Sequence, residues 1–192
     1  MQVVSPFWIR TGKQIPYPGL RQTSDTCVFV SIASAVNWLT QSNLTENEVV
    51  HQFQIAGQQE INFATVSAYI LSAFPAIEAI QYHDRDNPLT DLDELLERVN
   101  DGAVLILSLE AAASTGNAIH RINRWHMISI FKGGGDDAQV WDSNGYAGFL
   151  SWAEIQELLA GDTVAIPYPP IGFLVAHDQH DCLLVAWRQV LA

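Results

Sequence analysis

Residues 21–39 read RQTSDTCVFVSIASAVNWL, and this stretch decides the fold because a polar run changes there into an almost wholly apolar one. Polar residues recur within the apolar run at every third position, as Ser31, Ser34 and Asn37. This spacing leaves apolar side chains around most of a helix, so we predict a helix buried in the core over about residues 26–40. Side-chain oxygens of residues 23–26 are available to cap it. Cys27 lies in its first turn.

The elements outside this stretch follow from periodicity and capping signals. Further helices are predicted over residues 44–53, 62–74, 89–100 and 151–161. Strands are predicted over residues 103–109, 125–132 and 138–142, with one or two more in the last thirty residues. Helices come first and antiparallel strands second, so the sequence predicts an α+β fold in which an N-terminal helical lobe packs against a C-terminal antiparallel sheet. No linker or repeat divides the chain, and we expect residues 1–192 to form a single domain.

Composition limits the classes of function. The chain has 192 residues, 48% of them hydrophobic, with nine Lys and Arg against 21 Asp and Glu, which gives a net charge of −12. This charge opposes a phosphate backbone, so we expect no nucleic-acid partner, whereas a basic protein or peptide is electrostatically easier. No apolar run reaches the roughly 20 residues of a membrane span, and the N-terminus lacks a secretory signal. We therefore expect a cytoplasmic protein, or one secreted by a route that needs no signal peptide.

The two cysteines, Cys27 and Cys182, are predicted to be free thiols, because two cysteines so far apart form no disulfide framework. A helix N-terminus favours the thiolate, so the placement of Cys27 predicts a lowered pKa and a nucleophile. Cys182 is next to Asp181, which would raise its pKa, and we interpret it as structural. Residues 177–182, HDQHDC, include potential metal ligands but lack a second closely spaced pair. We expect no metal and no organic cofactor.

A catalytic cysteine needs a base, a group that orients the base, and donors for the oxyanion. His126 is the candidate base, and it is expected to open a strand with Ile128 on its own side of the pleat. The orienting group is Asp142 in one hairpin register and Asn144 in the next, and the sequence leaves both open. Gln22, five positions before Cys27, is the candidate oxyanion donor.

The order Gln22, Cys27, His126, Asp142 resembles the papain-like cysteine peptidases. Within them, the stretch DSNGYAGFLSWAEI (residues 142–155) is similar to the bacteriocin-processing peptidases that cut after a double-glycine leader, although Ser143 stands where those enzymes often have proline. The resemblance implies a papain-like fold in which the buried helix carries the nucleophile. It also implies hydrolysis by a Cys-His-Asp triad.

The resemblance leaves several functions open. It implies a protein or peptide substrate, which could contain Gly-Gly, and a role either as a stand-alone processing enzyme or as an antibacterial effector toxin paired with an immunity protein. One alternative is an amidase that cuts cell-wall peptides. A second is a papain-like module that binds a peptide without cutting it.

Overall fold

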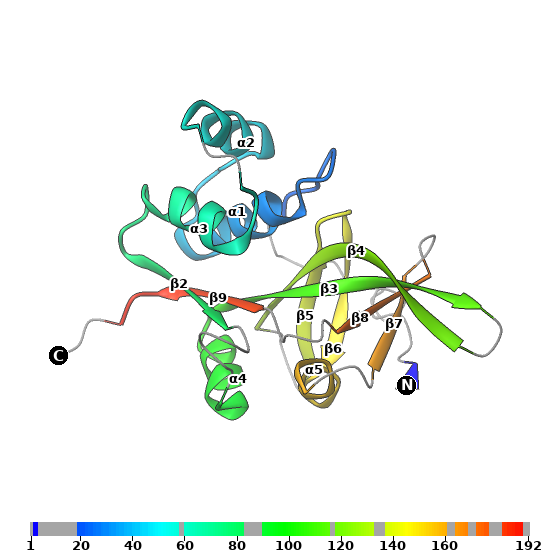
Figure 1. Cartoon of the computed structure of the whole chain (residues 1–192). Coiled ribbons are helices and arrows are strands. Elements are labelled where there is room, and N and C mark those ends of the chain that lie inside the picture. Colours follow the sequence, from blue (N-terminus) through cyan, green and yellow to red (C-terminus); the bar gives the residue numbers. More distant parts are fainter. Residues whose placement is uncertain are drawn as a thin grey trace.

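The computed structural model describes residues 2–3, 19–57, 60–82, 90–115, 118–132, 137–160, 164–168, 172–176 and 182–189. Within these ranges, helices lie on both sides of one sheet (Figure 1). The helices are α1 (Cys27–Thr40), α2 (Glu46–Ile55), α3 (Phe63–Leu71), α4 (Leu92–Asn100) and α5 (Trp152–Leu159). The strands are β1 (Gln2–Val3), β2 (Ile77–Tyr82), β3 (Val104–Thr115), β4 (Ala118–Phe131), β5 (Asp137–Asp142), β6 (Tyr146–Ser151), β7 (Val164–Tyr168), β8 (Gly172–Ala176) and β9 (Cys182–Trp187).

The long strand β3 organises the sheet. It pairs with β4 along one edge, and along its other edge with β9 near its start and with β8 near its middle. The path runs β1-β7-β8-β3-β4-β5-β6, and β2 pairs with β9. Every described pair is antiparallel except β1 with β7. The predicted α+β fold, with a helical lobe packed against an antiparallel sheet, is confirmed.

Local signals in the sequence explain where the helices begin. Capping boxes start α2, α3 and α5, in which the side chain before the helix and the third helical residue bond to each other's backbone N–H. The predicted pair Thr45 and Glu48 forms one of these boxes. All the predicted helices are present, with ends that differ by a few residues. Of the helices described, none combines the length and apolarity needed to cross a bilayer.

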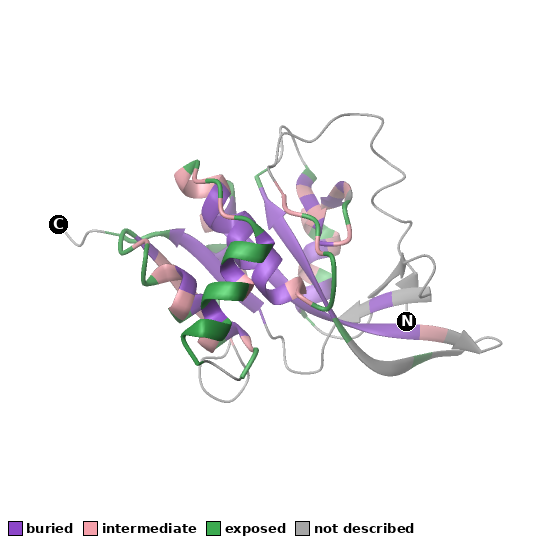
Figure 2. Cartoon of the chain, turned by 90° about the horizontal axis from the view of Figure 1, so that it is seen from above, coloured by how far each residue is buried: buried purple, intermediate pink, exposed green. Residues whose placement is uncertain are grey.

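Two hydrophobic cores lie on opposite faces of the sheet. Along β3, Leu105 and Leu107 face the core covered by α4 and α5, whereas Val104 and Ile106 face the core covered by α1, α2 and α3. This alternation is the two-residue period of a strand buried on both faces. Figure 2 shows buried residues along the helices and the central strands. One sheet therefore belongs to both cores.

The sequence missed β2 and β6 as strands. In β2, Ile77 belongs to the core of α1–α3, and Ile80 and Tyr82 pack against the core of α4 and α5. A strand that is apolar toward both faces shows no alternation of polar and apolar residues, so its period is hidden. The C-terminal part also forms three strands, β7, β8 and β9, where one or two were predicted.

Candidate active site

Cys27 is the first residue of α1, as the sequence predicted, and it is partly buried. The next ten residues of the helix are all buried, because α1 lies between the sheet and the helices α2 and α3. The thiol is therefore attached to a rigid element and stands where that element emerges from the core. Cys182 is also a free thiol, and it is fully buried at the start of β9. The interpretation of Cys182 as a packing residue agrees with this burial.

The predicted lowering of the Cys27 pKa is wrong in sign. Burial of the thiol raises its pKa above the ordinary value, and this is the largest effect. The backbone N–H groups of Val28 and Cys27 act in the opposite direction, as expected at a helix N-terminus, and the charges of Asp25 and Asp142 raise the pKa further. Loss of hydration outweighs the field of the helix, so the resting group is a thiol.

The predicted side-chain cap of α1 is also absent. Thr26 occupies the cap position but makes no side-chain bond to the helix backbone. Its hydroxyl donates to Glu46 instead, and the hydroxyl and backbone N–H of Thr23 donate to the same carboxylate at 2.9–3.1 Å. The first N–H groups of α1 therefore face the Cys27 thiol rather than a capping oxygen.

His126 and Asp142 form a buried pair. Nε2 of His126 lies 2.9 Å from Oδ1 of Asp142, and the same oxygen accepts a 2.7 Å bond from the backbone N–H of Asn144. Asp142 is completely buried, and His126 is almost so. An ionised carboxylate beside Nε2 favours the tautomer with the proton on that nitrogen, which leaves Nδ1 as the basic ring atom.

The position of this pair in the sheet differs from the prediction in two ways. His126 does not open its strand, because β4 begins eight residues earlier at Ala118. Ile128 pairs with Asp142, the register that puts His126 level with Asn144 rather than with Asp142. The imidazole nevertheless bonds to Asp142, which is the diagonal neighbour across the two strands. The strand register alone would therefore indicate Asn144 as the partner of His126, whereas the observed hydrogen bond is to Asp142.

An aromatic contact joins α1 to β4. The ring of Trp38 on α1 is 5.3 Å from that of Phe131 on β4, measured between centroids. Back to Cys27, the helix spans eleven residues, or about 16 Å. Back to His126, the strand spans five residues, also about 16 Å. Cys27 and His126 therefore lie at similar path lengths, along α1 and along β4, from the contact between Trp38 and Phe131.

By the alternation of β4, the side chain of His126 and the helix α1 belong to opposite faces of the strand. His126 shares its face with Ile128, as predicted, whereas Met127 and Phe131 pack toward α1. The Cys27 thiol is close enough to Asp142 for the charge of that carboxylate to raise its pKa. Catalytic hydrogen bonds often form only once substrate is bound, and in this structure Asp142 is the group that relates the thiol to the imidazole.

Gln22 is fixed to the turn that follows Asp142. Its backbone N–H donates to the carbonyl oxygen of Ser143 at 2.7 Å, and its side-chain Oε1 accepts a 2.6 Å bond from the Ser143 hydroxyl. The sequence did not identify Ser143 or Glu46 as members of the site. No local signal reveals them, because Ser143 lies 121 positions from Gln22 and Glu46 lies 20 from Thr26.

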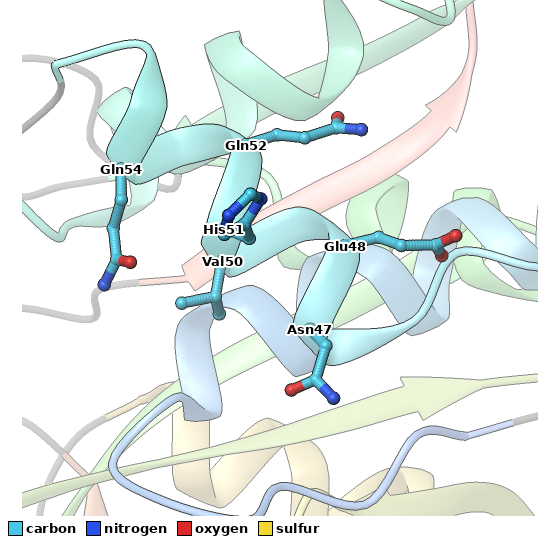
Figure 3. A pocket seen from close by; sticks show the side chains of 6 residues that line it. All are labelled: Asn47, Glu48, Val50, His51, Gln52 and Gln54. Atoms are coloured by element: carbon cyan, nitrogen blue, oxygen red, sulfur yellow. The ribbon is translucent and has the colours of Figure 1, made fainter.

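Two surface hollows lie away from these residues. One, of about 490 Å³, is lined only by residues of α2, whose side chains point in different directions and enclose nothing (Figure 3). The other, of about 540 Å³, lies between α3, β2 and the end of β9. No cluster of three or more metal-ligating side chains occurs in the described part of the chain. Residues 177–181 of the HDQHDC stretch are outside that part.

Comparison with known proteins adds little to this geometry. No protein-family model and no curated protein sequence matches the chain. Among solved structures, the Pseudomonas avirulence protein AvrPphB is similar, with 14% sequence identity over 91% of this chain and 98% of that one. The TM-score of 0.39 is too low for this likeness to carry an argument about function. The candidate site therefore depends on the residues of this chain.

Proposed function

We propose that this protein is a cysteine peptidase in which Cys27 is the nucleophile, His126 the base and Asp142 the group that orients the base. The observation that carries the proposal is the buried 2.9 Å bond between His126 and Asp142, whose carboxylate is close enough to Cys27, the first residue of α1, to raise the pKa of its thiol. A buried imidazole held by a carboxylate next to a thiol is the arrangement that nucleophilic catalysis by cysteine requires.

The reaction begins with a protonated thiol. Burial raises the pKa of Cys27, so His126 Nδ1 takes the proton as the sulfur forms its bond to the substrate carbonyl carbon. The carbonyl oxygen becomes an oxyanion, which accepts hydrogen bonds from the backbone N–H of Cys27 and the side-chain amide of Gln22. The imidazolium formed on His126 is stabilised by the charge of Asp142.

The intermediate collapses by breaking the bond between carbon and nitrogen. His126 returns its proton to the leaving amine, and an acyl thioester remains on Cys27. A water molecule then gives a proton to His126 and attacks the thioester, which releases the carboxylic acid and restores the thiol. No step requires a metal or an organic cofactor.

The substrate is a protein or peptide. The resemblance to double-glycine-leader peptidases supports cleavage after Gly-Gly, and the net charge of −12 favours substrates that carry basic residues. Two biological roles fit this chemistry: processing of a leader peptide, and action as an effector toxin held in check by an immunity protein. Expression of wild type and Cys27→Ala in bacterial cytoplasm distinguishes them, because only a toxin slows growth in a Cys27-dependent way.

Hydrolysis of p-nitrophenyl acetate tests the catalytic assignment without knowledge of the natural substrate. We expect Cys27→Ala to abolish turnover, and His126→Ala to lower it by about 1,000-fold or more. Two matched controls, Cys182→Ala and His51→Ala, change a cysteine and a histidine elsewhere and should retain turnover. Iodoacetamide should label wild type and fail to label Cys27→Ala. Equal turnover by wild type and Cys27→Ala would contradict the proposal.

A further inference from the structure

The side chain of Ser143 contacts Gln22, the proposed oxyanion donor. Ser143 is 1% exposed and follows Asp142 directly, in the turn that leads from β5 to β6. Its carbonyl oxygen accepts from the backbone N–H of Gln22, and its hydroxyl donates to Gln22 Oε1. Two bonds to a single residue fix both the backbone and the side chain of that residue.

The direction of the hydroxyl bond decides what Gln22 presents to a substrate. A primary amide has an acceptor oxygen and a donor NH₂ at opposite corners. When Ser143 occupies the oxygen at 2.6 Å, the NH₂ group is directed to the other side and remains available as a donor. A free glutamine side chain rotates about its terminal torsion and presents either atom, whereas here the oxygen faces Ser143 and the structure has the donor orientation.

Neighbouring contacts hold the chain just before Gln22. Residues 19–26 are held on the helical side by the bond from Leu20 N to Ser34 Oγ on α1, and on the sheet side by the bond from Trp141 Nε1 to Leu20 O. Gly19 passes so close to the Trp141 ring that a Cβ there would lie 2.1 Å from it. These contacts hold the backbone two residues before Gln22, so we expect the orientation of Gln22 to be sensitive to loss of the Ser143 hydroxyl.

We propose that Ser143 is a positioning residue that orients the Gln22 amide toward the oxyanion and thereby links the turn after Asp142 to the segment before Cys27. This inference rests on the proposed peptidase function. The turn that carries the orienting carboxylate then serves catalysis twice, once through Asp142 and His126, and once through Ser143 and Gln22. Ser143 does not touch substrate; it acts through Gln22.

Two chemical probes of Cys27 distinguish an effect on the oxyanion donor from an effect on the thiol or the base. Alkylation of Cys27 by iodoacetamide displaces iodide at a saturated carbon and forms no oxyanion, whereas acyl transfer from p-nitrophenyl acetate does form one. We expect Ser143→Ala to lower kcat for the ester by about 10-fold, the equivalent of one lost orienting hydrogen bond, with KM unchanged. The rate of Cys27 alkylation should stay within about twofold of wild type, because thiol and base are intact. Ser143→Thr keeps the hydroxyl and should recover much of the ester activity.

A double-mutant cycle completes the test. Gln22→Ala should lower kcat by about 100-fold, and adding Ser143→Ala to it should have no further effect, because the group that Ser143 orients is already absent. Ester hydrolysis by Ser143→Ala equal to that of wild type, or full additivity with Gln22→Ala, would overturn the role of Ser143 and leave the peptidase proposal intact. Absence of Cys27-dependent ester hydrolysis in wild type would overturn both. Unchanged alkylation shows that each variant is folded at the site.

Discussion

At the scale of single residues, the Cys27 thiol is governed by competition between burial and charge. Removing the thiol from water disfavours its anion, and the two carboxylates nearby add to this effect. The backbone N–H groups at the start of α1 favour the anion but do not prevail. The Cys27 thiol is therefore neutral at rest and less open to oxidation, and in the proposed mechanism it becomes reactive only when His126 removes its proton.

The pH dependence of alkylation follows from this raised pKa. In a folded protein with a raised thiol pKa, the thiolate fraction at pH 7 lies below that of a free cysteine, whose pKa is about 8.5. The rate with iodoacetamide should therefore rise continuously from pH 7 to beyond pH 9, without the plateau near neutrality that a stable thiolate–imidazolium pair gives. Quenching the reaction at set times and measuring the labelled fraction of Cys27 by mass spectrometry gives the rate at each pH.

Asp25 offers a selective way to shift the same pKa. Its exposed carboxylate raises the Cys27 pKa, so Asp25→Asn should lower that pKa and speed alkylation at pH 7.5 by about twofold at low salt. In 1 M salt this difference in alkylation rate should disappear, because the Debye length is then about 3 Å and the charge of residue 25 is screened from the thiol. Asp93→Asn removes an exposed carboxylate from α4 and serves as the matched control. A slower reaction of Asp25→Asn would contradict the assigned direction.

At the scale of elements, α1 and α2 are joined at their N-termini by one carboxylate. Glu46, at the first position of α2, is 9% exposed and accepts bonds from Thr23 and Thr26 on the segment before α1. It therefore holds both ends of the stretch that separates Gln22 from Cys27. The contact explains why the Thr26 hydroxyl does not cap α1, because that hydroxyl donates to Glu46 instead.

Replacement of Glu46 should loosen this junction. Glu46→Ala leaves the described donors of Thr23 and Thr26 without that acceptor, so we expect a loss of about 1.5–3 kcal/mol in the free energy of unfolding. Urea unfolding followed by circular dichroism measures the loss. Glu97→Ala, at an exposed position of α4, is the control and should change stability by less than about 0.5 kcal/mol. Equal stabilities of the two variants would show that the junction contributes nothing.

At the scale of the whole molecule, one sheet carries both cores. Adjacent residues of β3, Leu105 and Ile106, are fully buried and point to opposite cores. A strand shared in this way transmits the loss of packing on one face to the other, because its ladder bonds with β4 and β9 are common to both. This arrangement supports the prediction that the chain folds as a single domain.

Cavity-forming substitutions on the two sides of β3 test that prediction. Leu105→Ala and Ile106→Ala should each lower the free energy of unfolding by about 2–5 kcal/mol. In a single cooperative domain, each variant should accelerate amide hydrogen exchange in both α1 and α5, which mass spectrometry resolves by peptide. Acceleration confined to α5 in Leu105→Ala and to α1 in Ile106→Ala would indicate two independent units.

The sequence by itself determined the elements that have a local cause. The buried helix over residues 27–40 follows from its spacing of polar residues, and the capping boxes at Thr45 and Ser151 follow from side chains three positions apart. The candidate nucleophile, base and orienting carboxylate were also identified from order and spacing. Each of these signals lies within a few residues or within one hairpin, where the chain's own geometry limits the alternatives.

Only the tertiary structure decided which groups contact each other. It gave His126 a hydrogen bond to Asp142, the diagonal neighbour, although the register puts His126 level with Asn144. It also reversed the expected pKa of Cys27, since burial depends on how α1 packs and not on its first turn alone. Ser143 entered the site through a residue 121 positions away. Contact and burial depend on the packing of distant segments, and for that reason no local pattern contains them.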